Sequence, residues 1–240
     1  MEGSQKQSDS IGGVLTNAPL FIAAAHELKS PLALVRQLSL GIETGDMSPS
    51  QIERLARQIT LTSERALRLT TDLTRSARLE GGLFSLEPLN PASLCREVVE
   101  EISPLYAAQG RVVRFTSRRR SLLGVANRDL LRRIVLNFVD NALHYGSDKA
   151  PVVLSTTVLE GWAKIRLSVR DYGPAVPIST AKNAGNTPGA LHSRPESSGL
   201  GIYIARQFAE AMNAQIGTTR HRDGATFYVD IGTSTQMRLL

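Results

Sequence analysis

The chain has 240 residues and a formal net charge of +6, a length that fits two modest domains or one large one. Aromatic residues make up only 5% of the chain and no zinc-finger spacing occurs, which argues against a nucleic-acid-binding module. The single cysteine, Cys95, excludes an internal disulfide framework and fits a reducing, cytoplasmic compartment.

The amino terminus, residues 1–13, is polar and lacks the basic and then apolar order of a signal peptide. We expect a disordered lead or a remnant of cloning there. No apolar run approaches the ~20 residues that a membrane helix needs. The sequence leaves open that the chain belongs to a longer protein, in which an upstream sensor or membrane segment tethers it to the inner membrane.

Apolar residues recur at alternating spacings of three and four from residue 14 to 42, and again from 52 to about 80. This repeat predicts two long helices that each carry an apolar seam. Between them, Ser48, Pro49 and Gln51 form a capping box with proline at the first helical position. Residues 14–82 are therefore predicted to form a helical hairpin. Either a second copy completes a four-helix bundle, which we favour, or the second domain covers the seam.

The first predicted helix contains the sequence HELKSP, from His26 to Pro31. It collects a titratable nucleophile, an acid and a cation within one turn. Pro31 lacks an N–H donor and clashes with the carbonyl of residue 27, so it is expected to kink or loosen the helix after His26. A histidine on a helix serves many ordinary roles, and a surface turn is the alternative interpretation. The proline favours a functional one.

Glycines at 81 and 82 and prolines at 88 and 91 mark a linker, residues 83–92, after which the pattern becomes mixed α and β. Residues 93–235 are predicted to form this second domain, followed by a tail at 236–240. The expected helices lie at about 91–108, 127–145 and 200–213, and the expected strands at 112–116, 122–125, 151–159, 163–170 and 225–231. Residues 172–198, rich in Gly, Pro, Ser and Asn, are predicted to be a lid.

Three polar clusters lie in the second domain. Asn137 and Asn141, four apart on a predicted helix, project from one face and need a ligand, a metal or an internal hydrogen bond. Asp171 ends a predicted strand, where it can accept from an exocyclic amine of a base or simply begin a turn. Gly199 and Gly201 open a helix whose amino end can approach phosphate.

In this order, the clusters resemble the catalytic core of sensor histidine kinases of two-component systems. HELKSP is similar to the H-box of that family, LNFVDNALHYG to the N-box, DYGPAVP and SSGLG to the two Gly boxes, and DGATF to the closing Gly-Thr-Phe signature. The resemblance covers about residues 14–232. It implies a fold of class α plus α/β: a helical hairpin that dimerises into a four-helix bundle, followed by an α/β-sandwich (Bergerat-type) ATP-binding domain.

The resemblance also implies roles for individual residues. His26 would accept the γ-phosphoryl group of ATP, and Glu27 would strengthen its imidazole as a nucleophile. Asn141 would hold Mg²⁺, with Asn137 supporting the metal shell. Asp171 would recognise the adenine amino group. The further nucleotide-binding residues implied are His144, Tyr145, Gly173, Gly199, Leu200, Gly201 and Thr226.

The implied activity is that of a protein histidine kinase, a homodimer that passes phosphate from His26 to an aspartate of a response-regulator receiver domain. Related chaperone and gyrase ATPases have Glu in place of Asn137, and an amide is a poor general base, so the site would hold ATP without efficient hydrolysis. Ser30 stands where the family more often has Thr or Asn, a position tied to regulator dephosphorylation, and its hydroxyl could orient water.

Two alternatives remain open. Ala175 and Ser197 replace glycines of the two Gly boxes, and no Phe occurs between Gly173 and Gly199. These departures are the support for one alternative, a nucleotide-binding pseudokinase that binds partners through the bundle without transferring phosphate. The other alternative is a stand-alone ATPase of the same fold.

Overall fold

The computed structural model describes residues 18–78, 84–117, 122–147, 150–159, 161, 163–173 and 200–234. The predicted lead, the predicted lid beyond Gly173, Gly199 and the predicted tail at 236–240 lie outside the described residues. The helices are α2 (Ala18–Thr44), α3 (Pro49–Arg78), α4 (Pro91–Ala108), α5 (Arg128–Tyr145) and α7 (Leu200–Ala211). The strands are β1 (Glu87–Leu89), β2 (Val113–Ser117), β3 (Gly124–Ala126), β4 (Val152–Val158), β5 (Lys164–Asp171), β6 (Gln215–His221) and β7 (Gly224–Thr233).

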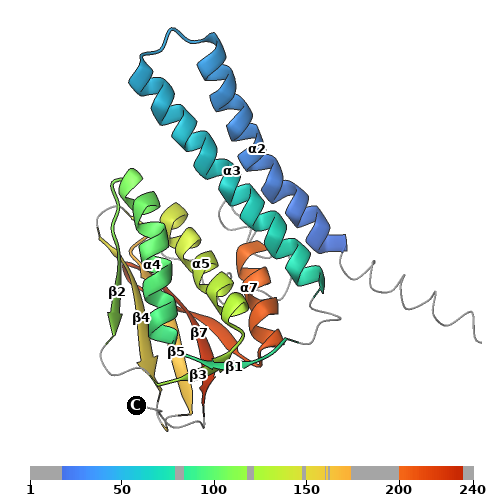
Figure 1. Ribbon diagram of the computed structural model, residues 1–240, viewed down its shortest axis with the longest axis vertical. Helices are drawn as coiled ribbons and strands as arrows, with labels where there is room; N and C mark the ends of the chain where they lie inside the picture. The colour runs from blue at the N-terminus through green and yellow to red at the C-terminus, as the bar shows by residue number, and fades with distance from the viewer. Residues whose placement is uncertain are drawn as a thin grey trace, which may run out of the picture.

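Helices α2 and α3 pack side by side as a long hairpin (Figure 1). The predicted capping box starts α3: the Ser48 N–H donates to Gln51 Oε1 at 2.8 Å, and the Gln51 N–H donates to Ser48 Oγ at 3.4 Å. Pro49 is the first helical residue. Helix α2 continues through Pro31, so the proline does not end the helix at the HELKSP sequence. No helix among the described residues is both long and apolar enough to cross a membrane.

The strands form one sheet in the order β1-β3-β7-β5-β4-β2, with β6 added to β7. Among the described strands, β2 and β4 pair in parallel, and the other pairs are antiparallel. Helices α4, α5 and α7 cover one face of this sheet, and the hairpin leans against the helical layer (Figure 1). The core lies between the sheet and the three helices.

Strand β5 shows how the sheet positions a polar group at its end. Its residues alternate between buried and partly exposed, and Ile165, Leu167 and Val169 face the helices. The next residue with the same orientation is Asp171, which is 6% exposed. The apolar face of this strand therefore ends in a buried carboxylate, beside the helical layer.

Two strands were not expected from the sequence. Strand β1 falls in the predicted linker and contains Pro88, and β6 reads QIGTTRH, with little alternation of apolar residues. Strand β1 gains its hydrogen bonds from β3, which is distant in sequence, and β6 gains its hydrogen bonds from β7, which directly follows it in a hairpin. Local periodicity carries no signal for such strands, because the partner supplies the stability.

The second domain covers part of the hairpin seam. Ala24 of α2 is buried in the core, and Leu69 and Leu73 of α3 pack against it. Other apolar side chains of the hairpin stay exposed, with Leu32 at 60% and Leu67 at 67%. One chain therefore leaves an apolar hairpin surface that a further partner can cover.

Candidate functional site

Helix α5 carries the two predicted amides. The side chain of Asn127 caps its start by accepting from the Leu130 N–H at 3.1 Å. The Nδ2 atom of Asn137 is buried and has no hydrogen-bond partner in the described part of the chain. A Cβ atom built on Gly201 would lie 3.7 Å from Asn137 Oδ1, so the first turn of α7 runs past this amide. The structure thus brings Asn137 and Gly201 together and leaves the buried Nδ2 donor without a partner among the described residues.

The carboxylate of Asp171 is held in place by the backbone. The Ala225 N–H donates to its Oδ1 atom at 2.9 Å. Gly224 has φ +143°, and a Cβ atom built on it would lie 2.9 Å from Asp171 Oδ1 and overlap the Asp171 carbonyl oxygen. Glycine is therefore required at this position of the predicted Gly-Thr-Phe signature. The Oδ1 atom of this buried carboxylate is therefore fixed by the backbone of β7.

Thr226 does not join this group. In the sheet register Asp171 pairs with Ala225, and Thr226 pairs with Arg170. Because neighbouring residues of a strand point to opposite faces, Thr226 lies on the face away from Asp171. Its hydroxyl is 2.8 Å from His221 Nε2, within hydrogen-bond distance.

His26 lies on the surface of α2, two residues beyond the buried Ala24, on a helix that contacts α7. Within the described ranges its imidazole makes no hydrogen bond or ion pair. Glu27 is partly buried and Ser30 is exposed. Neither nitrogen of the exposed histidine ring is therefore engaged by the described part of the chain.

Part of the predicted site cannot be placed. His144 and Tyr145 belong to the last turn of α5, but their side chains lie outside the described residues, as does Gly199. Gly173 is described after the end of β5, and Leu200 is a buried residue at the start of α7.

Residues 126–235, which run from the end of β3 through β7, match the family model of the histidine kinase-, DNA gyrase B- and HSP90-like ATPases. Over 207 residues the chain is 30% identical to the sensor protein CutS of Streptomyces coelicolor, covering 84% of this chain and 49% of CutS. The chain is a relative of the sensor histidine kinases. It spans about half the length of CutS.

Solved structures of this family share the fold. The histidine kinase ThkA, in complex with the response regulator protein TrrA, superposes with a TM-score of 0.66 at 19% identity, over 99% of this chain and 66% of that one. Full-length ShkA in complex with AMPPNP gives a TM-score of 0.61 at 22% identity, over 88% of this chain and 46% of that one. The predicted family is confirmed, as is the fold of a helical region followed by an α/β ATP-binding domain.

In this histidine kinase relative, the hairpin contacts α5 through charged side chains. Asp72 of α3 lies 3.3 Å from Arg133 of α5, measured from Oδ1 to Nη1. Two further ion pairs join the helices: Arg68 with Asp140 at 3.9 Å, and Arg75 with Asp129 at 3.6 Å. Asp140 precedes Asn141, so the hairpin touches the helix turn that carries the predicted magnesium ligand.

Asp72 is 5% exposed, and its Oδ1 has no hydrogen bond among the described residues despite the nearby Arg133. Burial raises the pKa of this carboxyl from 3.8 to about 6, and the charges of Arg133, Arg75 and Arg68 oppose the rise only in part. Asp140, a like charge, adds to the rise. The hairpin contact therefore contains a carboxylate that titrates near neutral pH.

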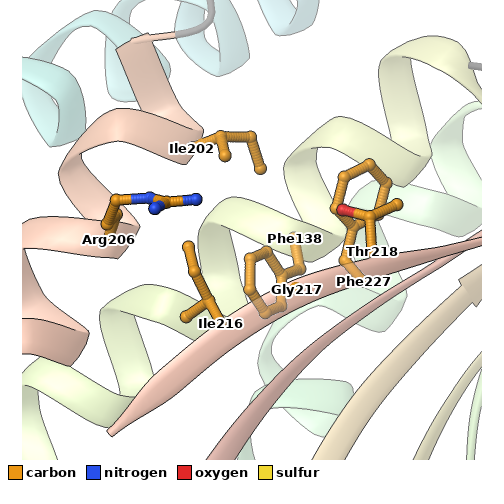
Figure 2. Close-up of a pocket in the computed structure, with 7 residues that line it drawn as sticks. All are labelled: Phe138, Ile202, Arg206, Ile216, Gly217, Thr218 and Phe227. Carbon is orange, nitrogen blue, oxygen red and sulfur yellow. The ribbon is translucent and has the colours of Figure 1, made fainter. Parts of the chain in front are cut away.

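A small pocket opens between α5, α7 and the β6–β7 pair (Figure 2). It has about 20 Å³ of space for water-sized molecules. Its lining residues are Phe138, Ile202, Arg206, Ile216, Gly217, Thr218 and Phe227. The pocket holds a water molecule or two but no nucleotide, and neither Asp171 nor Asn141 lines it.

Sequence reasoning missed the residues that join the ends of α5 and β5. The Ser147 N–H donates to the Tyr172 carbonyl at 2.7 Å, and the buried side chain of Arg111 donates to the Ser147 carbonyl at 3.2 Å. The sequence does contain one indication of Arg111, because this arginine directly follows Gly110 at the end of a predicted helix. The carbonyl partners could not be found from spacing, because they lie more than thirty residues away.

Proposed function

We propose that this chain is an autophosphorylating protein histidine kinase that transfers the γ-phosphoryl group of ATP to His26. The observation that carries this proposal is the exposed, unbonded imidazole of His26 on a helix that packs against the ATPase domain. Its relatives among sensor proteins support the same activity.

The nucleotide would lie between α5, the end of β5 and the start of α7. Asp171 would accept a hydrogen bond from the adenine amino group, and the buried Asn137 amide would reach an oxygen of the nucleotide. Asn141 would offer its amide oxygen to Mg²⁺, a hard cation that prefers oxygen ligands and would neutralise phosphate charge when bound. His144, Tyr145, Gly173, Gly199, Leu200 and Gly201 would complete this surface.

The transfer requires one bond to form and one to break. A ring nitrogen of His26 forms a bond to the γ-phosphorus, the bond from that phosphorus to the β–γ bridging oxygen breaks, and ADP leaves with the electron pair. Glu27 would hold or take the proton on the other ring nitrogen. Since the Asn137 amide is a poor base, attacking water is not activated and the phosphoryl group is kept for the histidine.

The phosphoryl group would then pass to an aspartate of a response-regulator receiver domain that docks on the hairpin near His26. The complex of ThkA with TrrA supports a partner of this kind. The exposed Leu32 and Leu67 support a homodimer, in which two hairpins form a four-helix bundle. Ser30, exposed one turn after His26, is the candidate for orienting water in the reverse dephosphorylation.

Incubation of the full chain with γ-labelled ATP and Mg²⁺, beside a His26→Gln variant, tests this function. We expect acid-labile, base-stable label on the wild type and none on the variant, with both binding ATP equally. An unlabelled wild type that still binds ATP would instead identify a pseudokinase. Steady phosphate release that survives loss of His26 would identify a stand-alone ATPase.

A further inference from the structure

A buried arginine joins the two elements that carry the nucleotide-site residues. Arg111 follows the turn after α4 and is 7% exposed. Its Nη1 atom donates to the Leu143 carbonyl, and its Nη2 atom donates to the Ser147 carbonyl at 3.2 Å. The last carbonyls of a helix lack intrahelical partners and carry partial negative charge, so a guanidinium is well matched to the end of α5.

Ser147 connects Arg111 to the end of β5 through its backbone. While its carbonyl accepts from Arg111, its N–H donates to the Tyr172 carbonyl at 2.7 Å, and Tyr172 directly follows Asp171. Gly146 permits the close approach, because a Cβ atom there would lie 2.6 Å from Arg111 Nη2 and overlap the Ala142 carbonyl. A chain of three hydrogen bonds thus runs from the last turn of α5, through Arg111 and Ser147, to the residue after Asp171.

Tyr106 contacts both Arg111 and α5. The Arg111 guanidinium lies 5.7 Å from the centre of the Tyr106 ring, and the Tyr106 hydroxyl donates to the Val139 carbonyl of α5 at 2.9 Å. Burial raises the pKa of Tyr106, so its hydroxyl remains a donor. Two consecutive turns of α5, on either side of Asn141, are therefore held from the same side.

We propose that Arg111 is a positioning residue of the nucleotide site, which sets the separation and orientation of Asn141 and Asp171 by fixing the end of α5 to the end of β5. The inference rests on the proposed function, in which a nucleotide spans these two side chains. Arg111 acts through them and touches no substrate. Misplacement of reacting groups by about 1 Å slows reactions by up to about 100-fold, and we expect a comparable loss for a nucleotide held by both side chains.

The test compares Arg111→Met, which keeps the volume but loses charge and donors, with Arg111→Lys and with Arg96→Met. Arg96 is the matched control, since it lies on α4, where its guanidinium lies 5.5 Å from the centre of the Phe115 ring and donates to Ser93 of the same helix. Calorimetry on the full chain gives Kd values for MgADP and MgGDP, and thermal unfolding confirms the fold at the assay temperature.

We expect Arg111→Met to weaken MgADP binding about 10- to 100-fold and to reduce the preference for adenine over guanine, because that preference depends on the alignment of Asp171. Arg111→Lys should lie between the wild type and Arg111→Met, and Arg96→Met should match the wild type. If Arg111→Met does not fold, Arg111→Lys is tested on the same two quantities. A lower melting temperature with unchanged Kd and unchanged base preference overturns the inference. A wild type that binds neither nucleotide overturns the proposed function itself.

Discussion

At the scale of residues, Asp171 is the side chain whose role is most closely defined by geometry. The Ala225 N–H holds Oδ1, and Gly224 makes room for that contact. An Asp171→Asn variant keeps an acceptor for Ala225 but places an NH₂ group where, in the proposed site, Oδ2 would accept from the adenine amino group. We expect ATP binding to weaken by about 10- to 100-fold, as for loss of a hydrogen bond to a charged group, with little change in melting temperature.

The matched control for this prediction is Asp223→Asn, a carboxylate on the neighbouring turn that pairs with Arg170 and is mostly exposed. Calorimetric titration with ATP is the measurement. Equal affinity of Asp171→Asn and the wild type would show that Asp171 does not read the base.

The sequence motifs located Asp171, Asn137 and Gly201 because each belongs to a short pattern with a local physical reason. The same kind of pattern predicts Thr226 as a site residue, yet its hydroxyl lies on the other face of β7. Which residue faces Asp171 depends on the pairing of β5 with β7 across more than fifty residues. Motif spacing does not contain that register.

At the scale of elements, Asp72 links the contact between α3 and α5 to pH. Its pKa is about 6 in the folded protein and 3.8 for an ordinary carboxyl, as in the unfolded chain. Between these pH values the folded state therefore binds a proton more readily than the unfolded state does. The free energy of unfolding therefore increases as the pH falls from 7 toward 4. This contribution of Asp72 is lost as the pH rises through about 6. The charges that face Asp72 are Arg133, Arg75, Arg68 and Asp140.

An Asp72→Asn variant should thus be more stable than the wild type at pH 7.5, by on the order of 3 kcal/mol, and the difference should shrink to about half by pH 5. Denaturant unfolding of the full chain at both pH values measures it. Asp129→Asn, an exposed carboxylate of the same contact, should stay within about 0.5 kcal/mol of the wild type. A destabilised Asp72→Asn at pH 7.5 would mean that the ion pair with Arg133 outweighs burial.

The helices of the hairpin were predictable because their seams repeat every three or four residues and the capping box of Ser48 and Gln51 marks the start of α3. The charged contact between α3 and α5 was not, since its partners are separated by about sixty residues. Strand β1 was missed because its hydrogen bonds come from the distant β3. Strand β6 was missed because its own residues show little alternation, and its pairing with the next strand, β7, stabilises it.

At the scale of the whole molecule, the exposed apolar side chains of the hairpin predict self-association. Leu67 of α3 and Leu32 of α2 lie mostly in solvent in the single chain. We expect a dimer in sedimentation equilibrium, and a monomer when both are replaced by Lys. Asp223→Lys, an exposed change away from the hairpin, should leave the dimer intact. A monomeric wild type at micromolar concentration would exclude the four-helix bundle.

In the proposed reaction, ATP bound by the ATPase domain phosphorylates His26 of the hairpin. A ³¹P NMR spectrum of the full chain after incubation with MgATP tests it most directly, because phosphohistidine, free phosphate and ADP give separate signals. The wild type should show a phosphohistidine signal that is absent from His26→Gln and Asn141→Ala, with little free phosphate. Free phosphate accumulating equally in the wild type and His26→Gln, without a phosphohistidine signal, would contradict the claim.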